Sequence, residues 1–304
     1  MAENNTQTER VGFVGIGNMG VPMSRHLKKA GFELTLYDVD SAAAKTCAEE
    51  LGCQSVTSIK ELAAASDIII TMLPTGHIVR QVMLEPAGDA LADHLAAGSL
   101  LIDMSSSDPS GSKELGTLLA EKNVQFVDAP VSGGVNGAIN GTLAIMLGGD
   151  DANAIERAKP VLSAMGTRIF ETGPLGSGHA MKALNNSVTA AGFAAASEAL
   201  IVGERFGLKP DVMVDIFNVS TGRNFSTELT IKNEVITGNF ASGFALALLS
   251  KDVKIAADLA LSLEMDMPLL AETNRRWLSA LDDLGGDNDH TLAFTSWKNK
   301  TTQT

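Results

Sequence analysis

The sequence contains few residues of the types that cross-link small folds or bind metal ions. Its 304 residues include 2 cysteines and 5 histidines, and aromatic side chains make up 5% of the chain. Cys47 and Cys53 match no common zinc or redox spacing, so we expect two reduced thiols and no disulfide framework. The histidines are scattered and form no ligand pattern. We therefore predict no metal site.

Positive charge and long uncharged apolar runs are also scarce. Lys and Arg total 23 against 36 Asp and Glu, a net charge of −13. Nucleic-acid binding needs a basic surface, so we expect no nucleic-acid partner. The most apolar long stretch, residues 178–203, contains Lys182 and Glu198, whereas a membrane span needs about 20 nearly uncharged apolar residues. We predict a buried helix there and no membrane partner.

The length and the first residues limit the organisation of the chain. At about 100–200 residues per domain, the length indicates two domains. Hydrophobic residues make up 45% of the chain, enough for a sizeable core. Residues 1–10 are polar and lack the apolar core of a signal peptide, so we expect a cytoplasmic protein.

The first part of the chain alternates short apolar runs with helix-length segments. Strands that alternate with helices indicate right-handed βαβ units and a mostly parallel sheet. We therefore predict an α/β fold with a Rossmann-type dinucleotide-binding domain over residues 1–176. The predicted strands lie near residues 11–14, 34–37, 68–73, 100–102, 126–127, 143–147 and 168–170.

The pattern changes at the breaker cluster of residues 173–178, which reads G-P-L-G-S-G. No strand with convincing alternation follows it, and Pro210 and Pro268 stand where helices should begin. We predict an all-helical domain for substrate binding and oligomerisation over residues 177–304, joined to the first domain by a long helix from Gly178. The predicted helices lie near 178–206, 210–218, 226–236, 246–264, 268–284 and 289–298.

A G-x-G-x-x-G motif follows the first predicted strand and opens a helix. In this position it is typical of dinucleotide binding. The first glycine allows a tight turn, the second lets a pyrophosphate approach the backbone, and the third allows close packing. The free N–H groups and the positive end of the helix then hold the anion. The predicted cofactor residues are Gly15, Ile16, Gly17, Asn18, Met19 and Gly20.

Asp38 ends the second predicted strand, 18 residues after Gly20. A carboxylate there can accept hydrogen bonds from the adenosine ribose hydroxyls, and it would repel a 2′-phosphate. No Arg or Lys lies beside it, so we predict NAD as the cofactor in preference to NADP; Asp40 is a weaker candidate for this role. Leu73 and Pro74 lie at the carboxyl end of the strand predicted near residues 68–73, and they are candidates for apolar contacts with the cofactor.

Four sequence blocks resemble the β-hydroxyacid dehydrogenase family, which includes 3-hydroxyisobutyrate dehydrogenase and tartronate semialdehyde reductase. The resemblance covers almost the whole chain and implies oxidation of a short 3-hydroxyacid by a nicotinamide cofactor, or the reverse. The blocks are F-V-G-I-G-N-M-G at 13–20, D-A-P-V-S-G-G at 128–134, G-H-A-M-K-A-L-N-N at 178–186, and Lys251-Asp252.

By this resemblance Lys182 is the catalytic residue. Lys182 and Asn186 are i and i+4 on one predicted helix, so they share a face with Asn185 beside them. Desolvation makes a lysine ammonium more ready to give up its proton. Lys182 could then take the substrate hydroxyl proton during oxidation or return it during reduction. Asn186 could orient Lys182 and the hydroxyl, and Asn185 is a candidate substrate ligand.

The resemblance also implies the other ligands. Ser132, Gly133 and Gly134 would bind the substrate carboxylate, because consecutive backbone N–H groups form a small anion nest. Ser106 would touch substrate and cofactor near the nicotinamide, and Lys251 would reach the cofactor. The three serines at 105–107 favour, weakly, a polar substrate. Arg223 has two open roles, as a partner for a substrate anion or as a residue at a subunit boundary.

Several alternatives remain open at this level. The leading hypothesis is a dehydrogenase of the 3-hydroxyisobutyrate type. Tartronate semialdehyde, another sugar acid or a short hydroxysulfonate could replace that substrate. An imine reductase would be expected to replace Lys182, and a non-catalytic dinucleotide-binding protein would be expected to lose Lys182 or the glycines; all are intact. We also expect a homodimer or homotetramer, because the apolar helix from Gly178 needs covering.

Overall fold

The computed structural model describes residues 9–85 and 89–300, which form two compact units. Unit 1 comprises residues 1–182 and unit 2 residues 183–304. No signal peptide is predicted in residues 1–10, and residues 1–8 of this segment lie outside the described residues. The cytoplasmic location stays a prediction. Among the described residues no helix combines the length and the apolar character needed to cross a bilayer.

Unit 1 is built on one sheet, in which the described residues contribute nine strands. The strand order is β3-β2-β1-β4-β5-β6-β8-β7, with β9 paired to β8. Strands β1 to β6 pair in parallel, while β8 runs antiparallel to β6 and β7. The strands are Arg10–Val14 (β1), Glu33–Tyr37 (β2), Gln54–Ser55 (β3), Ile68–Thr71 (β4), Leu100–Asp103 (β5), Gln125–Asp128 (β6), Val131–Ser132 (β7), Leu143–Gly148 (β8) and Gly166–Gly173 (β9).

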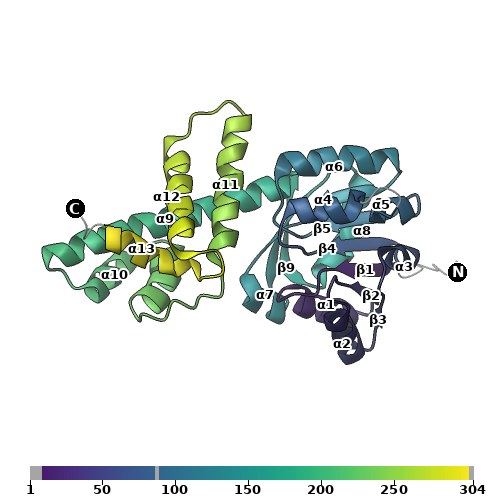
Figure 1. Ribbon diagram of the computed structural model, residues 1–304, viewed down its shortest axis with the longest axis horizontal. Coiled ribbons are helices and arrows are strands. Elements are labelled where there is room, and N and C mark those ends of the chain that lie inside the picture. Colours follow the sequence, from purple (N-terminus) through teal and green to yellow (C-terminus); the bar gives the residue numbers. More distant parts are fainter. Residues whose placement is uncertain (1–8, 86–88, 301–304) are drawn as a thin grey trace, which may run out of the picture. The chain divides into compact units, whose positions relative to one another are not determined.

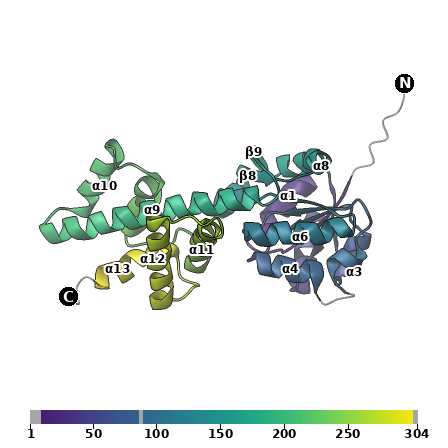
Figure 2. The same cartoon turned by 90° about the horizontal axis from the view of Figure 1, so that it is seen from above.

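Helices cover both faces of this sheet, and each face has its own core. One core contains Met23 and Leu27 of α1; the other contains Met83 of α4 and Leu119 of α6. Figure 2 shows α3, α4 and α6 together on one side of unit 1. The helices are Gly20–Lys29 (α1), Ser41–Leu51 (α2), Ile59–Ala64 (α3), Gly76–Leu84 (α4), Leu91–His94 (α5), Pro109–Glu121 (α6), Gly134–Asn140 (α7) and Ala152–Ser163 (α8). The predicted Rossmann-type fold is confirmed.

Local sequence explains where many of these helices begin and end. Asp40 accepts hydrogen bonds from the N–H groups of Ala42 and Ala43 and so caps α2. Gly52 ends the same helix in the left-handed conformation, at φ 62°. The two-residue strands β3 and β7 were not predicted, because they are too short to produce an apolar run.

Unit 2 is helical, as predicted, and the long helix α9 (Ser177–Phe206) runs into it from unit 1. The remaining elements are Pro210–Val219 (α10), Ser226–Val235 (η1), Leu246–Ser262 (α11), Pro268–Leu284 (α12), His290–Leu292 (η2) and Ala293–Lys300 (α13). Figure 1 labels α10, α11, α12 and α13. Prolines begin α10 and α12, as predicted. The helix expected at 226–236 is present as η1, but it is wound as a π-helix.

An aromatic cluster forms the centre of unit 2. Trp277 is fully buried, and its ring packs at 5.3 Å from that of Trp297 and at 5.7 Å from that of Phe193. The His290 ring lies 5.7 Å from that of Phe193. These aromatic residues therefore belong to the core, and they stabilise the helical unit by burying large apolar surfaces.

Candidate cofactor and active site

The glycine loop between β1 and α1 has the geometry that the motif predicts. Gly15 has φ 101°, and a Cβ there would lie 2.4 Å from the Met72 carbonyl oxygen. A Cβ at Gly20 would lie 1.9 Å from the Gly15 carbonyl oxygen. At Gly17 a Cβ would meet no described atom within 4 Å. The outer glycines are thus required by backbone contacts, and the middle one leaves open space for a ligand to approach.

The surroundings of this loop fit a dinucleotide. Among the described residues no side chain caps the amino end of α1, so its first N–H groups can serve an anion. Gly17 and Asn18 are exposed and Met19 is half-buried. The Leu73 side chain lies against the loop, 3.0 Å from where a Gly15 Cβ would stand. Pro74 is exposed beside Leu73.

Asp38 lies beside the same loop, where the motif analysis expected it. Its Oδ2 accepts a hydrogen bond of 2.6 Å from the Ile16 N–H, and its Oδ1 accepts one from the Asp40 N–H. Asp38 therefore braces the glycine loop, a role that the sequence did not reveal. A carboxylate has about four acceptor positions, which leaves capacity for ribose hydroxyls. Asp40, the weaker candidate, is used as the cap of α2.

The serine run at 105–107 is organised by the buried carboxylate of Asp103 at the end of β5. Asp103 Oδ2 accepts from the Ser107 hydroxyl at 2.8 Å, and Oδ1 accepts from the Thr71 hydroxyl at 2.9 Å. The Ser105 hydroxyl accepts from the Leu73 N–H. Ser105 and Ser107 are buried, whereas Ser106 is half-buried. Two of the three serines thus have hydrogen-bond partners within unit 1, and the weak preference for a polar substrate stays a prediction.

The turn after β7 has the expected open backbone. Ser132 is half-buried, Gly133 and Gly134 are exposed, and the two glycines have φ values of 131° and 60°. Side chains rarely adopt such conformations. The turn therefore presents its backbone without side chains in the way, as an anion nest requires; its predicted binding of the substrate carboxylate stays a prediction.

Helix α9 presents the predicted catalytic pair one turn apart. Lys182 is half-buried near the first turns, and Asn186 follows in the first residues of unit 2 with an exposed fraction of 8%. Within unit 2, Asn185 Nδ2 donates to Asn186 Oδ1 at 3.2 Å, and Asn186 Nδ2 donates to Asp252 Oδ2 at 2.6 Å. A buried carboxylate on α11 thus fixes the orientation of the Asn186 amide.

The two other cations considered in unit 2 are held by carboxylates. Lys251 Nζ lies 3.4 Å from Asp252 Oδ1. Arg223 is exposed and lies 3.6 Å from Glu228 Oε1, so its pairing within unit 2 favours neither of its two open roles. The contact of Lys251 with the cofactor stays a prediction.

Four buried polar residues beside the predicted site residues received no role from the sequence: Asp103, Asp128, His179 and Asp252. Asp103 and Asp128 both end parallel strands at the carboxyl edge, where ligands bind in open α/β sheets, and that rule could have singled them out. His179 and Asp252 stood inside the quoted blocks without a role. Their importance depends on side chains brought from distant positions, which no local pattern reveals.

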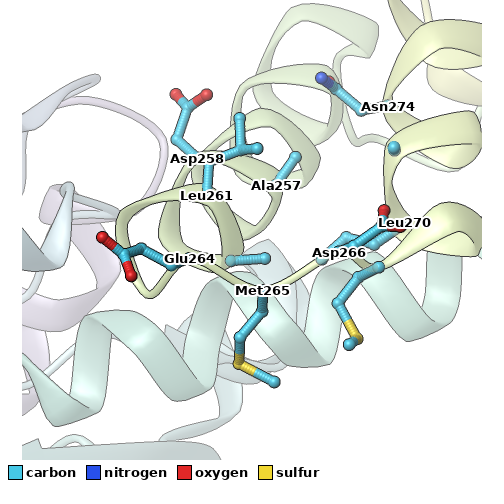
Figure 3. Close-up of a pocket in the computed structure, with 11 residues that line it drawn as sticks. Ala257, Asp258, Leu261, Glu264, Met265, Asp266, Leu270 and Asn274 are labelled. Atoms are coloured by element: carbon cyan, nitrogen blue, oxygen red, sulfur yellow. The ribbon is translucent and has the colours of Figure 1, made fainter.

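A separate cavity of about 380 Å³ lies in unit 2 between α11 and α12. Figure 3 shows Asp258, Leu261, Glu264 and Met265 around it, with Asn274 on the facing helix. None of the described residues that line it is a predicted site residue. We therefore place the candidate chemistry elsewhere.

We searched the described ranges 9–85 and 89–300 for metal-ligand groups and for reactive thiols. No group of three or more His, Cys, Asp or Glu side chains there is placed to hold a metal ion. Cys47 and Cys53 are free thiols, and burial raises the pKa of both. They are therefore poor nucleophiles.

Comparisons with known families agree with the two-part organisation. A family described as the NAD binding domain of 6-phosphogluconate dehydrogenase matches residues 10–173. A second family, described as NAD-binding of NADP-dependent 3-hydroxyisobutyrate dehydrogenase, matches residues 176–297. The first match ends at residue 173 and the second begins at residue 176, and both positions lie in the breaker cluster of residues 173–178.

Similar proteins extend over most of the chain. A 2-(hydroxymethyl)glutarate dehydrogenase of Eubacterium barkeri is 38% identical over 86% of this chain and 86% of its own length. The human mitochondrial 3-hydroxyisobutyrate dehydrogenase is 37% identical over 83% of this chain and 76% of its own. A solved structure of Mycobacterium tuberculosis 3-hydroxyisobutyrate dehydrogenase with L-serine has a TM-score of 0.85 and 31% identity, covering 95% of this chain and 99% of the other.

Proposed function

Because this chain belongs to the β-hydroxyacid dehydrogenase family, we propose that it interconverts a short 3-hydroxyacid and its semialdehyde, with NAD preferred over NADP. Oxidation of a CH–OH group with a nicotinamide dinucleotide is common to the family. The finer points, which are the substrate, the preferred dinucleotide and the residue roles, are our proposal. Two observations support this proposal. The glycine loop has space for a ligand at Gly17 and is hydrogen-bonded to Asp38, and Lys182 and Asn186 lie one turn apart on α9.

For the cofactor, the proposal assigns the pyrophosphate to the N–H groups that follow Gly15 and the ribose to Asp38. Leu73 and Pro74 would wall the dinucleotide, with Ser106 and Lys251 as further contacts. NAD is favoured because a 2′-phosphate would meet the Asp38 carboxylate, and Asp40 adds a second negative charge two residues away. When bound, the nicotinamide would supply the carbon that accepts or returns the hydride.

For the substrate, Lys182 would hold the proton of the reacting hydroxyl. During oxidation the Lys182 amine accepts that proton as the C–H hydride leaves, and during reduction the ammonium returns it. Asn186, oriented by Asp252, would hydrogen-bond the hydroxyl and align it with Lys182. Ser132, Gly133 and Gly134 would bind the carboxylate, with Asn185 as a further ligand.

The names of the similar proteins narrow the substrate class. 3-Hydroxyisobutyrate, 2-(hydroxymethyl)glutarate and L-serine are all 3-hydroxypropionates that differ in the group on carbon 2. The hydrogen bonds that Ser105 and Ser107 make within unit 1 support a substrate with few further hydroxyl groups. We therefore propose a primary alcohol on carbon 3, a carboxylate, and an apolar carbon-2 group of the 3-hydroxyisobutyrate type.

The test is NADH formation across a panel of small acids, with NADP in parallel. The panel holds 3-hydroxyisobutyrate, 2-(hydroxymethyl)glutarate, L-serine, 3-hydroxypropionate, glycerate, threonate and a hydroxysulfonate. We expect the highest kcat/KM with 3-hydroxyisobutyrate and NAD. Faster turnover of glycerate or threonate would establish a sugar-acid dehydrogenase instead. Inertness toward every member despite tight NADH binding would contradict the proposal.

We also propose that the protein forms a homodimer or homotetramer through unit 2. Large apolar side chains on α9 and α10 are exposed, among them Val188, Val202, Phe206, Ile216 and Val219. Burial of such apolar side chains in a subunit interface would be favourable. Light scattering of the purified chain should give a multiple of the 31.8 kDa monomer mass; a monomeric mass would exclude the assembly.

A further inference from the structure

His179 occupies a fully enclosed position in unit 1, between two buried carboxylates. Its Nε2 lies 3.6 Å from Asp103 Oδ2, and its Nδ1 lies 3.7 Å from Asp128 Oδ2. Nδ1 also lies 2.8 Å from the Ser112 hydroxyl oxygen on α6. His179 is 1% exposed, and the two aspartates are 1% and 0% exposed. The ring therefore links α9 to the ends of β5 and β6 and to α6.

The hydrogen-bond pattern sets the orientation of the ring. The Ser112 hydroxyl has one hydrogen, which it donates to the Asp108 carbonyl oxygen at 3.0 Å. It must therefore accept from His179, so Nδ1 carries a hydrogen. Nε2 has no hydrogen-bond partner among the described residues and faces Asp103. The ring therefore presents one nitrogen to Ser112 and the other toward Asp103, which an apolar side chain could not do.

Asp128 fastens the amino end of α9 from a distant part of the sequence. Its Oδ1 accepts from the Gly176 N–H at 2.7 Å, and its Oδ2 accepts from the His179 N–H at 2.8 Å. A carboxylate at this end of a helix is favoured by the helix dipole. A Cβ at Gly178 would lie 2.2 Å from the Met146 carbonyl oxygen. The first turn of α9 therefore has almost no freedom to shift against the sheet.

Asp103 anchors the loop of residues 105–107, as Asp128 anchors the first turn of α9. The Ser107 hydroxyl and the Ser105 N–H both donate to it, at 2.8 and 3.0 Å. Ser106 stands between these two anchored residues. Lys182 follows His179 by three positions, close to one helical turn. One buried imidazole thus stands between the carboxylate that anchors Ser105 and Ser107 and the helix turn that carries Lys182.

We propose that His179 is a positioning residue for the reaction. It sets the distance between Lys182 on α9 and the Ser105–Ser107 loop, through Asp128 on one side and Asp103 on the other. This inference rests on the proposed function, since it assumes that Lys182 and Ser106 act on the same substrate. His179 is enclosed and acts on the reacting groups through these neighbours.

The kinetic test compares two substitutions at His179 with one at another buried histidine. His179→Ala should lower kcat by about 10–100-fold, the usual effect of misplacing a reacting group by about 1 Å. The KM for NAD should change by less than about twofold, because the glycine loop is untouched. His179→Asn should recover most of kcat, since its amide can still donate to Ser112. With a deuterated 3-hydroxyacid, His179→Ala should increase the isotope effect on kcat.

The control is His290→Ala in unit 2. His290 is likewise buried, at 5% exposed, but it lies among aromatic rings. Its substitution should lower the Tm and leave kcat unchanged. If His179→Ala also lowered the Tm while keeping the kcat of the unsubstituted chain, the positioning role would be wrong.

A second readout needs no turnover and separates this inference from the proposed function. Hydrogen exchange followed by mass spectrometry should show faster exchange in residues 103–107 and in residues 177–182 of His179→Ala. His290→Ala should show neither change. Unchanged exchange in either segment would refute the link, even if the chain oxidised none of the acids in the panel. Faster exchange in both would support it in that case also.

Discussion

The two units each bury a histidine, and the two rings have different neighbours. In unit 1, His179 lies between Asp103 and Asp128 at the carboxyl edge of the sheet. In unit 2, His290 lies among the rings of Phe193, Phe244 and Trp277, with Asp289 Oδ1 at 3.8 Å from its Nδ1. Charged surroundings demand a definite arrangement of donors and acceptors, whereas aromatic packing mainly requires volume. The comparison indicates that the buried carboxylates around His179 fix geometry, whereas the aromatic rings around His290 mainly contribute stability.

The sharpest test of this contrast is Lys182→Ala. If the sheet edge positions Lys182 for proton transfer, kcat should fall by about 10³-fold or more, since general acid–base catalysis contributes about 10²–10⁴-fold. NADH binding, measured by fluorescence titration, should persist. Lys182→Arg should be equally slow, because a guanidinium keeps its charge and does not release a proton. A normal kcat in Lys182→Ala would move the proton transfer to another group.

A second test asks whether unit 2 also uses a buried polar pair for geometry. Asp252→Ala removes the acceptor of the Asn186 amide. Leaving that donor unpaired costs about 1–3 kcal/mol, so kcat/KM should fall by about 10–100-fold. Asp252→Asn retains an oxygen acceptor and should lose much less. Equal losses in the two variants would show that the charge of Asp252 matters rather than its hydrogen bond to Asn186.

Cofactor choice offers a smaller effect within unit 1. Asp38→Ala removes the carboxylate that would bind ribose and repel a 2′-phosphate, so the ratio of kcat/KM for NAD to that for NADP should fall by about tenfold. Asp40→Ala provides the matched control, because Asp40 is the adjacent exposed carboxylate and caps α2. The ratio in Asp40→Ala should fall by much less, because only a more distant charge is removed. A fall with Asp40→Ala alone would transfer the ribose role to Asp40.

The pH dependence of stability should give the smallest effect, and it concerns unit 2. Burial lowers the pKa of His290 below its ordinary value of 6.5. Below about pH 6.5 the unfolded chain therefore binds a proton that the folded chain does not, so the contribution is full above that pH and declines as the pH falls. The slope from one such group is at most about 1.4 kcal/mol per pH unit.

Urea unfolding at pH 7.5, 6.5 and 5.5, followed by tryptophan fluorescence, measures this effect, because Trp277 and Trp297 both lie in the unit 2 core. His290→Asn lacks the titrating group and should show a flatter profile. If the two profiles were parallel, His290 would not be the source of the pH dependence.

Much of this protein followed from the sequence alone. The alternation of strands and helices, the glycine motif and the change of pattern near residue 173 were enough to predict a Rossmann-type domain and a helical domain. These features are local: they depend on residue periodicity, on the φ values that glycine allows and on the helix starts that proline favours. Lys182 and Asn186 share a face for the same reason, since helix geometry sets it.

The tertiary structure alone decided which polar groups meet. Asp128 caps α9, which begins almost fifty residues later. Asp103 accepts hydrogen bonds from two serines and a threonine, and Asp252 accepts one from Asn186. Such pairings depend on which strand ends lie side by side and on how α11 packs in unit 2. A hydrogen bond requires two partners within about 3 Å, and sequence separation carries no information about that distance. The sequence motifs therefore indicate a dehydrogenase, whereas the tertiary structure determines which residues orient the proposed reacting groups.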